Sequence, residues 1–403
     1  MAPFAEVTRA AAEAPAREVG LAPDAATNIW QHAERLYATG LYPALALCIR
    51  RRGQVILDRS IGHAHGNAPF ASSRADRVIA TPDTLFNLFS ASKMVTAMLV
   101  HLCDQRGLLR LDDPVAHYLP KFAKHGKGRM TLRHVLTHRA GIPRIPTRFA
   151  DVGLLSDPSV VLDLLAEQRP LWRPGTRLAY HALTGGYVLG AVVEAVTGKP
   201  LREFLAETIL RPLGFSHFNY GVPAEEVGQV AQNAFTGPPL WPPVSTLIKR
   251  ALSVEFGEAV RISNDPRFLT AVVPAGNIIA TANEACRFMQ LLLNGGELDG
   301  VQVFEPRTLA RATAEQYFEF DVTLGVPVRY SMGFMLGARW LSVFGTDTSK
   351  AFGHLGFTNV FVWADPARQL SVALMTSGKP TLSPRLLRLM QLIQSIGANI
   401  PRA

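Results

Sequence analysis

A serine and a lysine three residues apart, Ser90 and Lys93, occur in the segment FSASK at the expected start of a helix. Residues i and i+3 share a helix face, so the Lys93 amine can lie beside the Ser90 hydroxyl. A serine hydroxyl needs a neighbouring base to become a nucleophile, and a desolvated lysine can lose its proton and serve as one. The spacing therefore predicts a serine nucleophile with a lysine base. A capping serine beside a surface lysine is the alternative.

Two further segments present residues that could join this chemistry. Tyr180 follows a Pro-Gly turn in RPGTRLAYHALTGG and precedes a glycine-rich helix, which would fix its position. His354 has glycines on both sides in FGHLGF, and glycine within a strand often marks the close approach of backbone or ligand. A half-buried tyrosine and a hydrogen-bonded strand histidine would explain each residue separately. Their occurrence together with Ser90 and Lys93 favours a catalytic site.

Metal and redox chemistry receive little support from the sequence. His134 and His138 are four residues apart on an expected helix, but Val135 follows His134 where a zinc protease has its glutamate. We therefore expect no metal and no other cofactor. The three cysteines lie far apart in apolar segments without Cys-x-x-Cys spacing, and we expect buried thiols at Cys48, Cys103 and Cys286.

Composition and charge limit the classes of protein to which this chain can belong. The chain has 403 residues, of which 48% are hydrophobic and 18% charged, a balance typical of a folded globular protein. The formal charge of +9 is scattered along the chain, so we expect no nucleic-acid partner. The N-terminal residues lack a secretory apolar core, and no apolar run is long enough for a membrane helix. We expect a cytoplasmic protein with a small-molecule substrate and no membrane partner; the oligomeric state stays open.

The hydrophobic pattern predicts strands, then helices, then strands again. A helix after Asp24 precedes a hairpin of ALALCIR and QVILDRS, and helical patterns dominate from residue 90 to about residue 215. Strand-like runs follow in YSMGFML, AFGHLGF, VFVWAD and LSVALMTSG, before a last helix over residues 383–396. Strands at both ends of the chain predict one sheet built from both termini with a helical domain inserted between them.

These elements imply a division of the chain into an arm and two domains. We expect residues 1–21 to form a loose arm, residues 22–89 and 270–403 an α/β domain, and residues 90–269 a helical domain. Residues 221–269 include four prolines close to Trp241 in TGPPLWPPVSTLI. Long loops near sites are often functional, so this segment is either a lid or an ordinary connection.

Taken together, these segments resemble the serine β-lactamase and penicillin-binding-protein superfamily, whose first motif is Ser-x-x-Lys. Within it, the resemblance is closest to the class C β-lactamase-like branch and to the family VIII carboxylesterases. It covers about residues 25–396 and includes LFNLFSASKMVTA, GLLRLDDPVAHYLP, TLRHVLTHRAGIP and EAVTGKPLREFLAETILRPLGF. Tyr180 matches the tyrosine of the family's Tyr-x-Asn motif, and HLG at His354 to Gly356 occupies the place of its Lys-Thr-Gly. The resemblance implies a β-lactamase-like α/β (α+β) fold, with an antiparallel sheet flanked by N- and C-terminal helices and an inserted all-helical domain.

The resemblance also implies a mechanism. Ser90 attacks an ester carbonyl, and Lys93 and Tyr180 share the proton transfers. We expect a charged Lys93 to favour a Tyr180 phenolate as the base, with a neutral Lys93 as the competing state. The oxyanion would lie against the backbone N–H groups of Ser90 and Phe357. Water then releases the acyl-enzyme, whereas another alcohol or an amine would make the protein an acyltransferase.

The sequence departs from the β-lactamase pattern at two places. Ala182 stands where β-lactamases keep an asparagine, and His354 and Leu355 replace the Lys-Thr pair that binds the drug carboxylate. Only Gly356 of the third motif is kept, as is common in family VIII esterases. We expect His354, Leu355, Gly356 and Trp241 to contact substrate.

These features predict a serine carboxylesterase that acts on small short-chain or aryl esters. Within the enzyme class, the alternatives are an acyltransferase that uses the same acyl-enzyme, a weak β-lactamase and a D-amino-acid amidase. A penicillin-binding-like sensor or scaffold is the non-enzymatic alternative. The sequence leaves hydrolysis and acyl transfer unseparated, because they differ only in the acceptor that the site admits.

Overall fold

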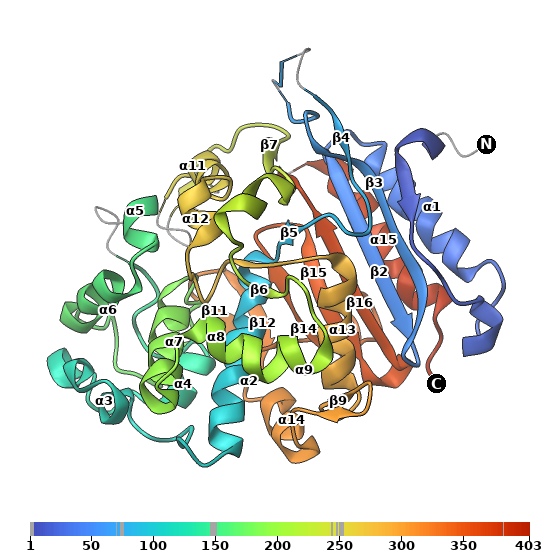
Figure 1. Ribbon diagram of the computed structural model, residues 1–403. Helices are drawn as coiled ribbons and strands as arrows, with labels where there is room; N and C mark the ends of the chain where they lie inside the picture. The colour runs from blue at the N-terminus through green and yellow to red at the C-terminus, as the bar shows by residue number, and fades with distance from the viewer. Residues whose placement is uncertain are drawn as a thin grey trace.

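Strands from the two ends of the chain form one antiparallel sheet in the computed structural model, which describes residues 4–69, 71–72, 76–145, 151–242, 245–246, 249, 254–381 and 383–403. The strand order is β1-β3-β2-β16-β15-β14-β13-β12-β11, with β4 paired to β3 (Figure 1). These strands are β1 (Thr8–Ala10), β2 (Ala44–Arg51), β3 (Gln54–His65), β4 (Val78–Ile79), β11 (Tyr317–Asp321), β12 (Val326–Tyr330), β13 (Met335–Leu336), β14 (Phe352–Gly356), β15 (Val360–Asp365) and β16 (Leu370–Thr376). Every neighbouring pair is antiparallel, and the segments β2 and β16 meet although Leu370 lies 319 positions after Arg51 in the sequence. The sheet confirms the predicted fold class.

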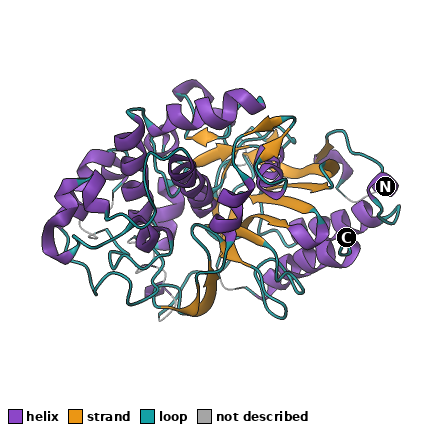
Figure 2. Ribbon diagram, turned by 90° about the horizontal axis from the view of Figure 1, so that it is seen from below, coloured by secondary structure: helices purple, strands orange, loops and turns teal. Residues whose placement is uncertain are grey.

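Both faces of the sheet are covered, so its central strands alternate between two apolar cores. On β2, Leu45, Leu47 and Ile49 face the core shared with α1 (Ala25–Tyr37) and α15 (Leu387–Asn399). Ala46 and Cys48 face the opposite core, which contains α2 (Ser92–Gln105) and α13 (Ala282–Leu293). Successive side chains of a strand point to opposite faces, which explains the near-continuous apolar run in β2. Figure 2 shows the sheet between the large helical part and the helices beside both termini.

The predicted helical domain is present but is not purely helical. Besides α2, its described α-helices are α3 (Val115–Tyr118), α4 (Leu132–Leu136), α5 (Val152–Leu155), α6 (Pro158–Glu167), α7 (Thr184–Thr197), α8 (Leu201–Leu205), α9 (Arg211–Leu213), α11 (Phe256–Ile262) and α12 (Pro266–Thr270). Two short strands, β6 (Asn219–Tyr220) and β7 (Ala234–Thr236), pair with β8 (Ile278–Ala280) and β17 (Gly378–Pro380). The strand β8 also pairs with β5 (Phe86–Asn87). Strands of two or three residues leave no period in the sequence, which is why the prediction of an all-helical insert was wrong in this detail.

The prediction of a loose N-terminal arm was also wrong for residues 4–21. The strand β1 pairs with β3 in the register Thr8 opposite Ile61, and so extends the sheet by one strand. Val19 and Leu21 are buried in the core beneath α1. A three-residue edge strand gains its order from the neighbouring strand, and its own sequence, Thr-Arg-Ala, gives no sign of it.

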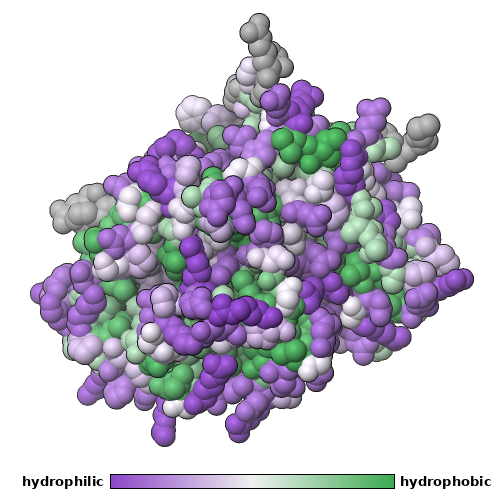
Figure 3. All heavy atoms as spheres, viewed as in Figure 1, coloured by the Kyte–Doolittle hydropathy of each residue, from purple (hydrophilic) through white to green (hydrophobic). Residues whose placement is uncertain are grey.

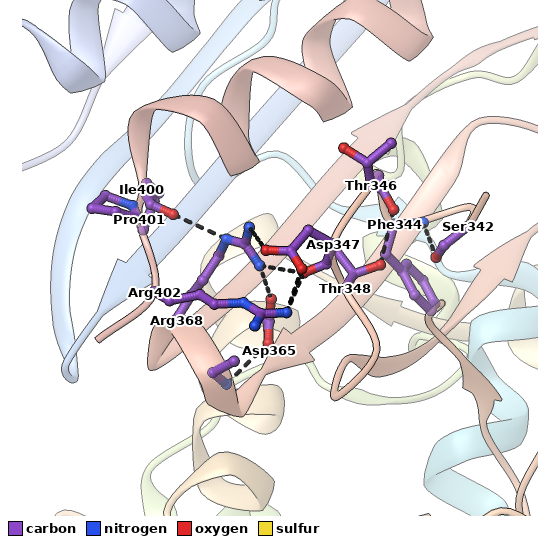
Figure 4. A network of polar contacts seen from close by, with 12 residues as sticks. Ser342, Phe344, Thr346, Asp347, Thr348, Asp365, Arg368, Ile400, Pro401 and Arg402 are labelled. Carbon is purple, nitrogen blue, oxygen red and sulfur yellow. Dashed lines mark hydrogen bonds and ion pairs between the residues drawn. The ribbon is translucent and has the colours of Figure 1, made fainter. Parts of the chain in front are cut away.

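The C-terminus is fixed by a network of charged groups around Arg368 (Figure 4). The Arg368 guanidinium donates to Asp365 Oδ2 at 2.7 Å, to the Asp347 carbonyl at 2.8 Å and to the Ile400 carbonyl at 3.0 Å. Arg402 forms a further ion pair with Asp347. These contacts join the loop before β14, the turn after β15 and the chain end into one unit.

Several smaller expectations can be compared with the structure. The three cysteines are buried free thiols, as predicted. On the face shown in Figure 3, hydrophilic side chains surround scattered apolar ones. Across the part of the chain that the structure describes, no helix combines the length and the apolar character that a membrane span requires. The remaining described strands and α-helices are a β9–β10 hairpin (Glu297–Leu298 and Val301–Gln302) and α14 (Pro306–Thr313).

Candidate active site

The turn that carries Ser90 has an unusual backbone. Ser90 lies in a 3₁₀ turn, Phe89–Ala91, that continues into α2. The preceding residue, Phe89, has a φ of 48°, a left-handed conformation that is rare for a bulky residue. The Phe89 N–H donates to Asn87 Oδ1 at 2.6 Å, which holds this conformation. Such strain persists only where the surroundings enforce it, and it often marks functional sites.

Lys93 lies one helical turn after Ser90 and directs its amine at it. The distance from Lys93 Nζ to Ser90 Oγ is 3.0 Å, and the amine also donates to the Ala275 carbonyl at 3.0 Å. The Lys93 side chain is buried, and this desolvation holds the pKa of Lys93 well below its usual range. The structure thus brings the predicted pair together, with a lysine that is poised to be neutral and to accept a proton.

Tyr180 completes this group from a different part of the chain. It lines the same cavity as Ser90, and its ring centroid lies 4.9 Å from Lys93 Nζ. Burial raises the pKa of Tyr180 above its ordinary value, and the carboxylate of Asp321 adds to this rise. A raised tyrosine pKa and a lowered lysine pKa both favour the uncharged pair. This electrostatic balance differs from the expected lysinium and phenolate, because both groups are shielded from water.

Gly356 explains how β14 comes close to the segment that carries Ser90. A Cβ atom at Gly356 would lie only 2.1 Å from the Leu88 carbonyl oxygen, so no other residue fits without a shift of backbone. The glycine therefore lets the end of β14 pack directly against the segment that precedes Ser90. This agrees with the expectation of a close backbone approach and places Phe357 beside the site, where its ring centroid is 5.1 Å from that of Phe89.

His354 lies in the cavity beside Tyr180, with a distance of 6.0 Å between ring centroids. Its Nδ1 is 2.6 Å from the Leu355 carbonyl oxygen, so this nitrogen carries the proton and donates it. Burial lowers the pKa of His354 to about 3, with the nearby Lys93 as a further cause. The position that carries a cationic lysine in the Lys-Thr-Gly motif therefore holds a neutral imidazole here.

A cavity of about 300 Å³ opens at Ser90, and apolar side chains form most of its wall. It is lined by Phe89, Ser90, Leu155, Tyr180, Ala182, Leu183, Val254, Phe256, Ala259, Ile262, Ser263, Phe268, Ala275, Gly276, Leu324, Met335, His354, Leu355, Phe357 and Thr358. Among the described residues, no lysine, arginine, aspartate or glutamate contributes to this lining. A cavity of this kind suits an uncharged, apolar group attached to the reacting carbonyl.

Two of the expected substrate contacts do not line this cavity. Trp241 is 75% exposed and is not part of the cavity wall. Gly356 acts through close packing against Leu88, as described above. In the segment predicted as a possible lid, the later part, residues 254–268, supplies the wall through α11 and the start of α12. Residues 243–244, 247–248 and 250–253 of that segment lie outside the described residues.

The structure also brings residues to Tyr180 that sequence reasoning did not assign to the site. The His138 ring centroid is 4.8 Å from that of Tyr180, and Asp321 Oδ1 accepts from the Tyr180 N–H at 3.0 Å. His138 had been considered with His134 as a metal ligand, but His134 Nδ1 instead accepts from the Thr131 N–H at the start of α4. Within the described ranges, no group of three metal-binding side chains occurs. Neither His138 nor Asp321 has a local motif that could have revealed its role.

Comparisons with known proteins are consistent with this geometry. The profile of the Beta-lactamase family matches residues 30–394. The Esterase/beta-lactamase LipL of Mycobacterium tuberculosis (strain H37Rv) is 30% identical over 345 residues, which cover 82% of this chain and 76% of LipL.

Two solved structures are similar over nearly the whole chain. A penicillin-binding protein homologue from Caulobacter crescentus superposes with a TM-score of 0.78 at 29% identity, covering 94% of this chain and 99% of that one. A family VIII carboxylesterase gives a TM-score of 0.76 at 27% identity, covering 93% and 98%.

Proposed function

This chain belongs to the beta-lactamase family, and from that premise we propose that it is a carboxylesterase that hydrolyses small, uncharged esters through an acyl-enzyme on Ser90. The observation that carries the proposal is the Ser90–Lys93 contact of 3.0 Å at the mouth of an apolar cavity without charged lining among the described residues. The similarity to LipL and to a family VIII carboxylesterase supports the ester as the substrate class.

Acylation begins with the transfer of the Ser90 proton to neutral Lys93. The Ser90 oxygen then bonds to the ester carbonyl carbon, and the resulting oxyanion lies against the backbone N–H groups of Ser90 and Phe357. When the carbon–oxygen bond of the ester breaks, the departing alkoxide takes the hydroxyl proton of Tyr180. Lys93 returns its proton to Tyr180, so the alcohol leaves neutral and both residues regain their starting state.

Deacylation repeats these steps with water in place of the serine. The neutral Lys93 and Tyr180 pair takes a proton from water, and the hydroxide attacks the acyl carbonyl. Ser90 leaves as the alkoxide and recovers its proton from the same pair. Both half-reactions use a site in which neutral groups are favoured by burial, so no buried charge has to be stabilised before the substrate arrives.

The lining of the cavity favours esters over β-lactams and peptides. A β-lactam or a C-terminal peptide presents a carboxylate, whereas the nearest counterpart of the motif lysine is the neutral His354. Placing a carboxylate in an apolar site without a cationic partner is unfavourable. Uncharged acyl groups would instead pack against the phenylalanine, leucine and isoleucine side chains of the wall.

The test is the release of p-nitrophenol from p-nitrophenyl butyrate by the wild type, Ser90→Ala and a control, Ser159→Ala. Ser159 is an exposed serine on α6, so its variant should keep the wild-type rate. Steady turnover by the wild type and the control, with Ser90→Ala at background, is expected. Mass spectrometry should also find one fluorophosphonate adduct on Ser90. Equal rates for wild type and Ser90→Ala would overturn the proposal, and so would an inert wild type.

A further inference from the structure

The catalytic tyrosine lies in a stretch of backbone that is neither helix nor strand. Residues 177–181 connect a turn to α7 without regular hydrogen bonding of their own. Three consecutive N–H groups of this stretch are nevertheless bonded to residues from elsewhere. The Ala179 N–H donates to the His138 carbonyl at 3.0 Å, the Tyr180 N–H to Asp321 Oδ1 at 3.0 Å, and the His181 N–H to His138 Nδ1 at 3.1 Å.

His138 forms two of these three contacts, one with its backbone and one with its side chain. It follows the end of α4 and has a φ of 59°, a conformation that is uncommon for residues other than glycine. Since Nδ1 accepts the His181 N–H, the proton of the neutral ring is on Nε2. The ring lies against the Tyr180 ring and, with Lys93, lines a small cavity of about 20 Å³. His138 therefore contacts Tyr180 and lines the same small cavity as Lys93.

Asp321 forms the third contact and ties it to the acyl cavity. The residue ends β11 and is completely buried. Besides the Tyr180 N–H, its Oδ1 accepts the Thr323 and Leu324 N–H groups at 2.8 and 3.0 Å. The Leu324 side chain lines the cavity at Ser90. One carboxylate oxygen thus fixes both the catalytic tyrosine and a loop that forms part of the acyl-binding wall.

We propose that His138 and Asp321 are positioning residues that hold Tyr180 against Ser90 through three consecutive backbone N–H groups. This inference rests on the proposed function, because it concerns the proton that Tyr180 gives to the departing alcohol. Loss of a contact would let the irregular backbone shift, and a displacement of about 1 Å in a catalytic group can lower a rate about a hundredfold. The effect should appear in kcat rather than in KM, since neither residue lines the acyl cavity.

Two substitutions at Asp321 distinguish the effect of its hydrogen bonds from a general effect on folding. Asp321→Asn keeps an oxygen acceptor for the three N–H groups, whereas Asp321→Ala removes it. With ethyl butyrate, kcat is expected to fall about a hundredfold in Asp321→Ala and less than tenfold in Asp321→Asn, with KM changed less than threefold in both. In the acylation step, reported by kcat/KM, the loss should be smaller with p-nitrophenyl butyrate, because p-nitrophenolate departs without a proton from Tyr180. Equal losses for the two leaving groups would show a merely structural role and overturn the proposal.

A second pair of variants replaces His138 by asparagine or by glutamine, which are both polar. Asparagine places an oxygen where His138 Nδ1 lies, while glutamine extends past it toward the place of Nε2. His138→Asn should therefore keep kcat within about tenfold of the wild type, and His138→Gln should lose about a hundredfold. If the two variants have the same kcat, the contact to the His181 N–H does not position Tyr180. This comparison remains decisive if Asp321→Ala fails to fold.

A control and a spectroscopic measurement distinguish this proposal from the proposed function. His101 is another buried histidine, on α2, with Nε2 2.9 Å from the Met332 carbonyl oxygen. His101→Asn should lower stability and leave the dependence on the leaving group unchanged. In protein labelled with 3-fluorotyrosine, the ¹⁹F signal that is missing in Tyr180→Phe reports on Tyr180 without any substrate. It should keep its position in His138→Asn and shift or broaden in His138→Gln; an unmoved signal in both variants would refute the proposal even if no ester is turned over.

Discussion

Two regions of this molecule bury cationic side chains in opposite ways. At the C-terminus, Arg368 is 6% exposed and shares its guanidinium with two aspartates and two carbonyl groups (Figure 4). Near Ser90, the amines of Lys93 and Lys379 are buried without a carboxylate partner among the described residues. Lys379 donates to the Thr376 carbonyl at 2.7 Å and lies 4.6 Å from the centre of the Phe89 ring.

The difference shows that a buried cation contributes either to stability or to reactivity, depending on whether carboxylates surround it. A buried cation with paired carboxylates keeps its charge and cross-links the segments that supply its partners. A buried lysine without them has its pKa lowered by desolvation, and for Lys379 the value falls to about 7. The first arrangement fixes a chain end, whereas the second supplies an amine that can accept a proton at neutral pH.

The largest effect is expected for Lys93→Met, which replaces the unpaired amine by an apolar chain of similar length. Ester hydrolysis should fall at least about a thousandfold, because Ser90 loses its proton acceptor. The midpoint of urea unfolding should stay the same or rise, since a desolvated amine is removed from the interior. Rates with p-nitrophenyl butyrate and unfolding curves check both parts. A variant with near-wild-type activity would place the base elsewhere.

Arg368→Met should give the reverse pattern. It leaves Asp365, which is 1% exposed at its side chain, without its cation, and breaking a buried pair costs about 3–5 kcal/mol. The free energy of unfolding should fall by that amount, while kcat per folded molecule stays unchanged. Unfolding in urea and active-site titration with a fluorophosphonate measure the two quantities. A loss of kcat at full folding would mean that the C-terminal network also shapes the site.

Lys379→Met should change how stability depends on pH. Between the folded pKa of about 7 and the unfolded value of about 10.4, the unfolded chain binds a proton that the folded protein does not. The free energy of unfolding of the wild type therefore rises with pH across this window, by up to about 1.4 kcal/mol per pH unit from this lysine. In Lys379→Met, the slope of the unfolding free energy against pH should be smaller by the contribution of one bound proton, about 1.4 kcal/mol per pH unit. Urea midpoints from pH 7 to 10 decide the matter, and parallel slopes for the two proteins would show that Lys379 is charged.

The smallest effect concerns the wall of the cavity rather than its amines. Ala259 on α11 lines the cavity, and leucine there would fill part of the space for the acyl chain. Ala259→Leu should lower kcat/KM for a hexanoate ester about tenfold relative to an acetate ester. Ala26→Leu on α1, across the sheet, serves as the control and should leave the ratio unchanged. An unaltered preference in Ala259→Leu would mean that the acyl group binds outside this cavity.

The acid limb of the activity profile gives a further check on the neutral lysine. Desolvation lowers the pKa of Lys93, so activity should be full above that pKa and decline as the pH falls through it. The decline must therefore begin far below the usual lysine value of about 10.4. Tyr180, whose pKa is raised, should cause no loss at alkaline pH below its ordinary value of about 10. Measuring kcat/KM from pH 5 to 10 tests both statements.

Sequence reasoning predicted the regular and locally encoded parts of this protein well. The helix after Asp24, the β2–β3 hairpin and the strands around His354 follow from apolar periodicity and turn residues, and each is present. The short pairings of β1, β6 and β7 were missed because their order comes from neighbouring strands. The β11–β12 hairpin was missed as well, since its outward side chains Phe318 and Phe320 are apolar and exposed, which removes the polar alternation of an edge strand.

The sequence by itself determined the pairing of Ser90 with Lys93, because the two residues are one helical turn apart and local geometry brings them together. The glycines beside His354 indicated a close approach of backbone or ligand, and in the structure Gly356 packs against Leu88. Only the tertiary structure decided the protonation states of Lys93 and Tyr180, the shape of the cavity at Ser90 and the contacts of Tyr180. Desolvation, cavity shape and the hydrogen bonds accepted by His138 and Asp321 depend on distant segments, since His138 is 43 residues from His181 and Asp321 is 141 residues from Tyr180. No local pattern records which of these segments will meet.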